Sequence, residues 1–137
     1  MACRVDTVVS QAERVAYPAL SMKLFVYGSL LSGERHNDRL GGAALLGSVL
    51  TEARYTLVDL GPYPALLEGG TTSVAGEIYE VDGARLAALD DFEGHPDEYR
   101  RMPVRLVAGG LAEAYVLPRA QAPDGRVIAS GNWRARR

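Results

Sequence analysis

Two short segments of this 137-residue sequence combine residues suited to anion-binding and acid–base chemistry. The first is Tyr27-Gly28-Ser29-Leu30, which follows an apolar run and predicts a turn with exposed backbone N–H groups. Successive N–H groups in such a turn bind an anion or a developing oxyanion. The second is the cluster of Asp90, Asp91 and Glu93 at the end of a helical pattern. A carboxyl group held there partly away from water has a raised pKa and can move protons near neutral pH.

Both segments also have an interpretation that requires no catalysis. The three acids could form a solvated face, or pair with Arg100 and Arg101. Carboxylates at the C-terminal end of a helix oppose its dipole, so this arrangement should cost stability. A Gly-Ser turn after a strand is common, so the turn alone indicates little about function.

Ser29 offers a different chemistry, in which its hydroxyl is a nucleophile and His95 is the base. The sequence contains no Gly-x-Ser-x-Gly elbow, and His95 lies in a Gly-His-Pro turn where a surface histidine is ordinary. Hydrolysis through Ser29 is therefore the weaker hypothesis.

The elements that must position these residues follow from apolar periodicity. Residues 23–27 are apolar on both faces, which predicts a strand covered on both sides. Residues 61–64 (Gly-Pro-Tyr-Pro) predict a rigid loop. Met102, Val104 and Leu106 alternate around Pro103, which predicts an edge strand because proline cannot donate to a ladder. The other predicted strands are two pieces within 48–60, one at 74–81, and one at 111–117 that pairs with the edge strand across Gly109-Gly110.

One helix is clearly predicted. Asp82 occupies an N-cap position, and Leu86, Leu89 and Phe92 recur at helical spacing up to Gly94. Residues 34–40 form a short polar segment that predicts one or two further helical turns. Many strands with one or two helices indicate an α+β domain built on a curled sheet or small barrel.

Composition narrows the possible partners. Fifteen Lys and Arg against seventeen Asp and Glu give a net charge of −2, so no global field favours nucleic acid or an anionic membrane. The single cysteine, Cys3, cannot form an internal disulfide, and with only His36 and His95 a zinc site would need unusually many carboxylates. We therefore expect no metal, no other cofactor, no nucleic-acid partner and no membrane partner.

The first 21 residues differ from the rest of the chain. They carry charges within short apolar pieces and lack the continuous apolar stretch of a secretory signal, so we expect a cytoplasmic protein. Every motif lies after Met22. The prediction is an N-terminal appendage at 1–21 and one domain at 22–137. At the other end, the three arginines of residues 133–137 are interpreted as a solvated tail.

Taken in order, these segments resemble the gamma-glutamylcyclotransferase-like family, including its avirulence-induced branch and short bacterial members. The matching pieces span residues 23 to 133, and no single piece is decisive. They are Phe25-Val26-Tyr27-Gly28-Ser29-Leu30, Tyr63-Pro64-Ala65-Leu66, Val74-Ala75-Gly76-Glu77-Ile78-Tyr79, Leu89-Asp90-Asp91-Phe92-Glu93-Gly94, Tyr99-Arg100-Arg101 and Ser130-Gly131-Asn132-Trp133.

The resemblance implies a small mixed β-barrel with one or two flanking helices. It implies that the Tyr27-Gly28-Ser29-Leu30 loop holds a gamma-glutamyl group, that Glu93 is the catalytic base, and that the substrate cyclises to 5-oxoproline and releases an amine. Tyr99 is expected to line or brace the site, whereas Arg101 falls on the polar side of its strand and is not assigned a role.

Three points stay open at the level of sequence. The loop could bind either the oxyanion or the alpha-carboxylate of the substrate. The leaving amine is not specified by any motif. The pocket could also bind a small molecule without turning it over, in which case the protein would be a binding module on the same fold.

Overall fold

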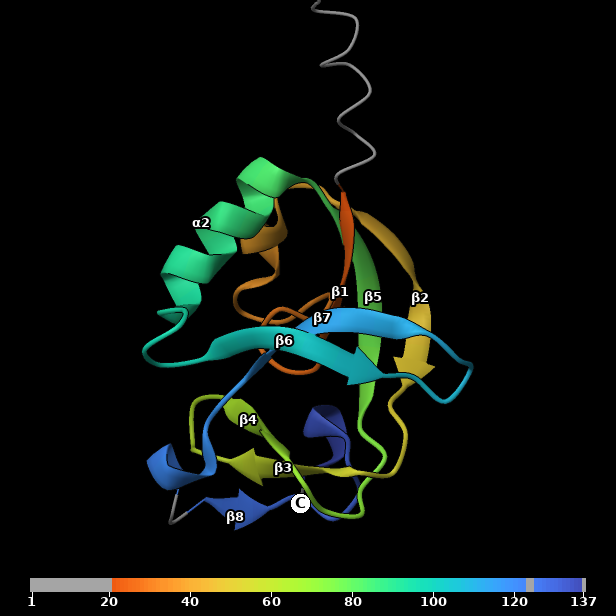
Figure 1. The fold of residues 1–137 in the computed structure, drawn as a ribbon, viewed down its shortest axis with the longest axis vertical. Coiled ribbons are helices and arrows are strands. Elements are labelled where there is room, and N and C mark those ends of the chain that lie inside the picture. The colour runs from red at the N-terminus through yellow and green to blue at the C-terminus, as the bar shows by residue number, and fades with distance from the viewer. Residues whose placement is uncertain (1–20, 123–124, 137) are drawn as a thin grey trace, which may run out of the picture.

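The centre of the fold is a buried strand flanked by two others. A computed structural model describes residues 21–122 and 125–136, and Figure 1 shows the arrangement. Strand β1 (Met22–Val26) pairs antiparallel with β5 (Ala75–Val81) and parallel with β7 (Leu111–Val116). Leu24, Phe25 and Val26 are all buried, as expected for a strand covered on both sides.

Eight strands form one mixed sheet. Its hydrogen-bonded order is β2-β5-β1-β7-β4-β3-β8, with β6 paired to β7 beside this path. The remaining bounds are β2 (Ala44–Leu50), β3 (Tyr55–Asp59), β4 (Pro64–Glu68), β6 (Arg100–Arg105) and β8 (Arg126–Val127). Strand β6 pairs with no other named strand, which confirms the edge position predicted from Pro103.

The predicted α+β class is confirmed, but the sheet does not close into a barrel. Strands β2 and β6 meet only where they end, through their last residues and those just after them. There, Thr51 and Leu106 form an isolated bridge, the Glu52 amide donates to the Arg105 carbonyl at 2.8 Å, and the Val107 amide donates to the Leu50 carbonyl at 2.9 Å. Closure needs a ladder along the length of adjacent strands. The curled, open sheet agrees with one of the two forms expected from the sequence, and the barrel that the resemblance implies is not closed.

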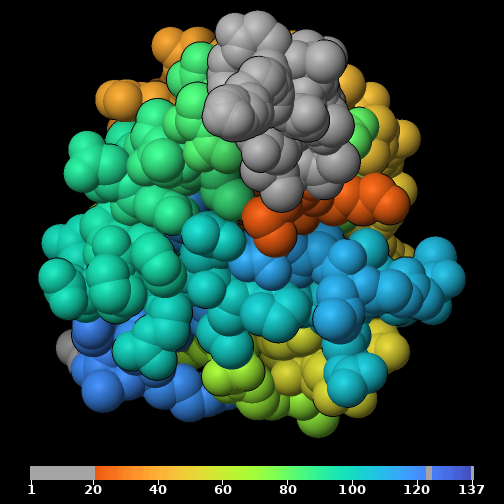
Figure 2. All heavy atoms as spheres, turned by 45° about the horizontal axis from the view of Figure 1, so that its top comes forward, coloured from red at the N-terminus to blue at the C-terminus, as the bar shows by residue number. Residues whose placement is uncertain are grey.

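Helix α2 (Gly83–Glu93) begins and ends where the sequence predicts. The Asp82 side chain caps it by accepting from the Arg85 amide at 2.8 Å, and Gly94 ends it in a left-handed conformation with φ 72°. Figures 1 and 2 both show α2 lying beside the β6–β7 hairpin. Short 3₁₀ helices in the described part of the chain lie at Asn37–Leu40, Arg119–Gln121 and Trp133–Ala135.

Strand β4 was not predicted. Pro64, assigned from sequence to the end of a rigid loop, is the first residue of β4, which pairs antiparallel with β3 and parallel with β7 through Leu66 and Val116. Proline is tolerated at the first position of a strand. This strand matters for the site, because it brings Pro64 against the loop that follows β1.

The predicted appendage, residues 1–21, lies outside the described residues except for Ser21. Among the residues that the structure describes, no helix is long and apolar enough to cross a membrane.

Candidate active site

The loop after β1 folds back on itself, and the amides of Ser29 and Leu30 are among those that its own turns leave unpaired. The Leu31 amide donates to the Gly28 carbonyl at 3.0 Å, and the His36 amide donates to the Ser29 carbonyl at 2.8 Å. Within residues 21–122 and 125–136, no acceptor pairs with the N–H groups of Ser29 and Leu30. These two groups are available to an anionic ligand.

A pocket of about 280 Å³ opens beside this loop. This volume is at the lower end of the roughly 300–1,000 Å³ typical of small-molecule sites. All six predicted site residues line it: Tyr27, Gly28, Ser29, Leu30, Glu93 and Tyr99. The structure therefore brings together the loop after β1 and the end of α2, which are more than sixty positions apart in the sequence. Their roles in binding and catalysis remain predictions.

Gly28 is required by the packing of the neighbouring strand. A Cβ atom at this position would lie 2.5 Å from Cγ and 2.6 Å from Cδ of Pro64. The proline ring is rigid and belongs to β4, so it cannot rotate away as a long side chain would. Any larger residue at position 28 must displace either the loop or the start of β4.

Glu93 is the last residue of α2, and its carboxyl group lines the pocket. The side chain is partly buried, and among the described residues no hydrogen bond or ion pair reaches its carboxyl oxygens. Burial raises the pKa of Glu93 from 4.5 to about 7, and the nearby charge of Glu98 adds to the rise. Glu93 is therefore poised to accept and return a proton near neutral pH.

The other acids of the cluster behave differently. The Asp90 carboxylate accepts two hydrogen bonds from Arg101, from Nε at 2.8 Å and from Nη2 at 3.1 Å, and one from the Tyr115 hydroxyl at 2.7 Å. Burial alone would raise the pKa of Asp90, but these donors outweigh burial and lower it. Asp91 is exposed. The interpretation as a paired acid therefore holds for Asp90 and not for Glu93.

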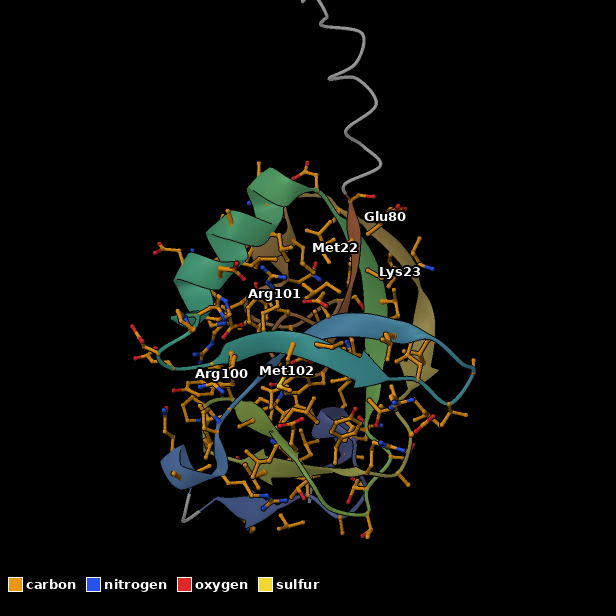
Figure 3. All side chains as sticks on the ribbon, in the orientation of Figure 1. Met22, Lys23, Glu80, Arg100, Arg101 and Met102 are labelled. Atoms are coloured by element: carbon orange, nitrogen blue, oxygen red, sulfur yellow. The ribbon has the colours of Figure 1, made fainter. Side chains whose placement is uncertain are left out.

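Arg101 braces the site from β6. Besides its contact with Asp90, its Nη1 lies 3.0 Å from Oε1 of Glu113 on β7. Figure 3 shows Arg101 on the α2 side of β6, with Arg100 and Met102 on the other side. Pairing of the acids at the end of α2 with Arg101 was one of the interpretations of the sequence, and it holds for Asp90. The second partner of Arg101, Glu113 on β7, was not foreseen.

Two tyrosines fix the pocket walls through hydrogen bonds. The Tyr27 hydroxyl donates to the Tyr115 carbonyl at 2.6 Å and accepts from the Leu66 amide at 3.2 Å. The Tyr99 hydroxyl donates to the Pro64 carbonyl at 3.0 Å. Burial raises the pKa of both phenols, so they stay protonated at neutral pH.

Several residues that line the pocket were not predicted from the sequence, because no regular spacing connects them to the predicted site residues. His36 follows the loop, and its ring meets Phe92 edge-on at 5.2 Å, with Nδ1 buried and unpartnered among the described residues. His95, proposed as a base for Ser29, does not line the pocket, and its Nδ1 accepts from the Arg101 amide at 2.9 Å. The other lining residues are Phe25, Val26, Tyr63, Pro64, Glu98 and Tyr115.

The C-terminal segment is not a free solvated tail, so that prediction was wrong for Arg134. Its guanidinium donates to the Ser32 carbonyl and lies 3.4 Å from Oε2 of Glu34 and 3.8 Å from Oε2 of Glu77. Glu77 is buried and also accepts from the amide of Ser32 at 2.8 Å and from its hydroxyl at 2.7 Å. These contacts fix the chain directly after the candidate anion-binding loop.

The fold and the pocket together define a small α+β domain in which the partly buried Glu93 and the unpaired amides of Ser29 and Leu30 share one pocket. Residues 24–135 match the family described as Gamma-glutamyl cyclotransferase, AIG2-like, and the chain belongs to this family.

Individual relatives agree. A Vibrio cholerae protein, provisionally named a gamma-glutamylcyclotransferase, is 42% identical over 110 residues, which cover 80% of this chain and 93% of the relative. Gamma-glutamylaminecyclotransferase A of Danio rerio is 35% identical over 115 residues, covering 74% of this chain and 71% of the relative. The solution structure of YtfP from Escherichia coli is 36% identical with a TM-score of 0.65, covering 82% of this chain and 96% of YtfP.

Proposed function

We propose that the protein converts a gamma-glutamyl amide into 5-oxoproline and a free amine. The observation that carries the proposal is Glu93, a carboxyl group free of ion pairs among the described residues, with a pKa of about 7, in the same pocket as the free amides of Ser29 and Leu30. Membership of the gamma-glutamylcyclotransferase family supports the general reaction.

The reaction needs one group that moves protons. Ionised Glu93 takes a proton from the alpha-ammonium group of the substrate, and the resulting amine attacks the gamma-carbonyl carbon of the same molecule. A new C–N bond closes a five-membered ring, and the bond to the leaving nitrogen then breaks. In total two protons leave the alpha-nitrogen, and both reach the leaving nitrogen, which departs as an ammonium ion. Glu93 therefore ends in its starting state.

The loop supplies the complementary charge. The substrate carries a permanent alpha-carboxylate, and its carbonyl oxygen becomes negative in the tetrahedral intermediate. The N–H groups of Ser29 and Leu30 are suited to hold such negative charge without a metal or a cationic side chain. Tyr27 and Tyr99 are held by backbone partners, so the pocket is shaped before the substrate enters, and attack within one folded molecule gains from proximity.

A mass-spectrometric screen of gamma-glutamyl amides for 5-oxoproline tests the proposal. We expect the parent protein to release 5-oxoproline, and Glu93→Gln to lower turnover by a factor on the order of 10² to 10⁴. Asp91→Asn is the matched control, because it removes an exposed acid from the same helix end. It should keep the parent rate.

A second measurement separates catalysis from binding. Glu93→Gln should retain the thermal stabilisation given by 5-oxoproline, because the loop that binds the ligand is unchanged. If the parent binds 5-oxoproline but releases none from any gamma-glutamyl amide, the protein is a binding module. If Glu93→Gln turns substrate over within a few-fold of the parent, Glu93 is not the base.

A further inference from the structure

The charges that line the pocket are unbalanced. Among the described residues, the lining contains two carboxyl groups, Glu93 and Glu98, and no Lys or Arg. The free amides of Ser29 and Leu30 are the donors available for the alpha-carboxylate of a gamma-glutamyl group. No side-chain cation is left in the lining for a second carboxylate on the same substrate.

Two arginines that contact residues of helix α2, Arg39 and Arg101, do not supply that cation. The guanidinium of Arg39 lies over the ring of Phe92, 4.3 Å from its centroid, but Arg39 is not among the residues that line the pocket. Arg101 is neutralised by Asp90 and Glu113. The field that a ligand meets in the pocket is therefore negative.

Glu98 is placed to act on the part of a substrate that extends out of the pocket. Its amide donates to the Gly94 carbonyl at 2.8 Å, which holds residue 98 against the end of α2, and its carboxyl group lies against Gly94. The residue is exposed, and no described cation forms an ion pair with it. Glu93 must face the scissile amide, so a leaving amine that continues toward solvent passes close to Glu98.

From this charge distribution we propose that Glu98 is a specificity residue that favours leaving amines carrying a second positive charge and disfavours those carrying a carboxylate. The inference rests on the proposed cyclisation and names its substrate class: gamma-glutamyl conjugates of diamines and longer polyamines. A leaving amino acid would bring its own carboxylate toward Glu98 with no described cation to receive it. A diamine would bring an ammonium group to the same place.

Three substrates of equal length test the inference. They are the gamma-glutamyl amides of 1,5-diaminopentane, n-hexylamine and 6-aminohexanoate, which end in an ammonium, a methyl and a carboxylate group. Attraction between exposed charges is modest and is screened by salt. We expect kcat/KM to fall in that order, by about three- to tenfold at each step at low ionic strength, and the steps to shrink in high salt.

Substitution of Glu98 tests whether this residue causes the preference for a positively charged leaving amine. Glu98→Gln should bring the ammonium-to-methyl and methyl-to-carboxylate ratios of kcat/KM close to one, because it removes the charge that distinguishes the three substrates. A ratio also cancels any general change in rate. Asp97→Asn is the matched control, since Asp97 is an exposed neighbouring acid that does not line the pocket. That variant should keep the parent ratios.

The outcomes separate this inference from the function on which it rests. Release of 5-oxoproline from all three substrates at rates that ignore terminal charge would overturn the role of Glu98 alone. A preference that survives Glu98→Gln would do the same. If another gamma-glutamyl amide yields 5-oxoproline but none of these three does, this inference fails and the proposed cyclisation stands. If no gamma-glutamyl amide yields 5-oxoproline, both fail.

Discussion

Glu93→Gln should stabilise the folded protein at alkaline pH, although it removes the proposed catalytic base. The pKa of Glu93 rises from 4.5 to about 7 on folding, chiefly through burial. The folded chain therefore binds more protons than the unfolded chain between these values, and stability falls as pH rises through this window. Glutamine has no charge to bury, so the stability of the variant does not fall in this way.

The magnitude follows from the size of the shift. One pKa unit corresponds to 1.36 kcal/mol, so the ionised carboxylate costs the fold about 3 kcal/mol well above pH 7. At pH 5 the cost is only about 1 kcal/mol, because the folded carboxyl is then almost fully protonated. Domains of this size are stable by roughly 5–15 kcal/mol, so the difference is a large fraction of the total.

Urea denaturation of parent and variant at pH 5 and pH 9 measures this effect without a known substrate. The stability of Glu93→Gln relative to the parent should increase by about 2 to 3 kcal/mol from pH 5 to pH 9. Comparing two pH values cancels contacts that the substitution changes equally at both. Glu98→Gln is the control: because burial is the larger cause of the shift, most of the parent's pH dependence should remain in it.

A relative stability that is the same at pH 5 and pH 9 would refute the reasoning. It would mean that Glu93 titrates in the folded protein as it does in an unfolded chain. The carboxyl group would then be fully ionised at neutral pH, and the argument for a poised base would lose its support.

Three further predictions concern the framework of the site. Gly28→Ala should weaken 5-oxoproline binding in calorimetry, because the new Cβ meets the Pro64 ring at 2.5 Å, whereas Gly83→Ala, with open space around its Cβ, should bind as the parent does. Glu77→Gln should lower the free energy of unfolding by about 1 to 3 kcal/mol in urea, because Glu77 accepts two hydrogen bonds from Ser32. Burial opposes ionisation of Glu77, but its hydrogen-bond donors outweigh burial and lower its pKa. The stability that ionised Glu77 gives the parent should therefore be lost as pH falls below about 4.5. If Glu77→Gln lost as much stability as the parent over this pH range, the prediction would be contradicted. Deleting residues 1–21 should leave the melting temperature within a few degrees, and a larger fall would show that this segment packs on the domain.

Local signals in the sequence were sufficient for the elements that begin and end through their own residues. Asp82 and Gly94 specify the two ends of α2, because capping depends on atoms within one turn of the helix. Pro103 identified an edge strand, because a missing N–H is a property of the residue itself. The family resemblance added the pairing of the loop at 27–30 with Glu93, which no local pattern contains.

The sequence was insufficient where an element depends on distant partners. Strand β4 lacks a distinctive pattern of its own and is recognised only by its pairing with β3 and β7. The sheet remains open because β2 and β6 meet only at their ends, and this depends on how far each strand extends beyond its neighbour. The contacts of Arg134 could not be predicted from the sequence, because they exist only where the fold places the C-terminal segment beside Ser32 and Glu77.

The acids at the end of α2 show most directly how tertiary structure decides chemistry. Asp90 and Glu93 lie three positions apart on one helix, and the sequence alone gives both the same unfavourable position against the helix dipole. Strand β6 supplies Arg101 and β7 supplies Tyr115 to Asp90, which lowers its pKa. No described partner reaches Glu93, so burial raises its pKa to about 7. The sequence determined that acids would gather here, and the packing of β6 and β7 against the helix decided that the pKa of Asp90 is lowered and that of Glu93 is raised.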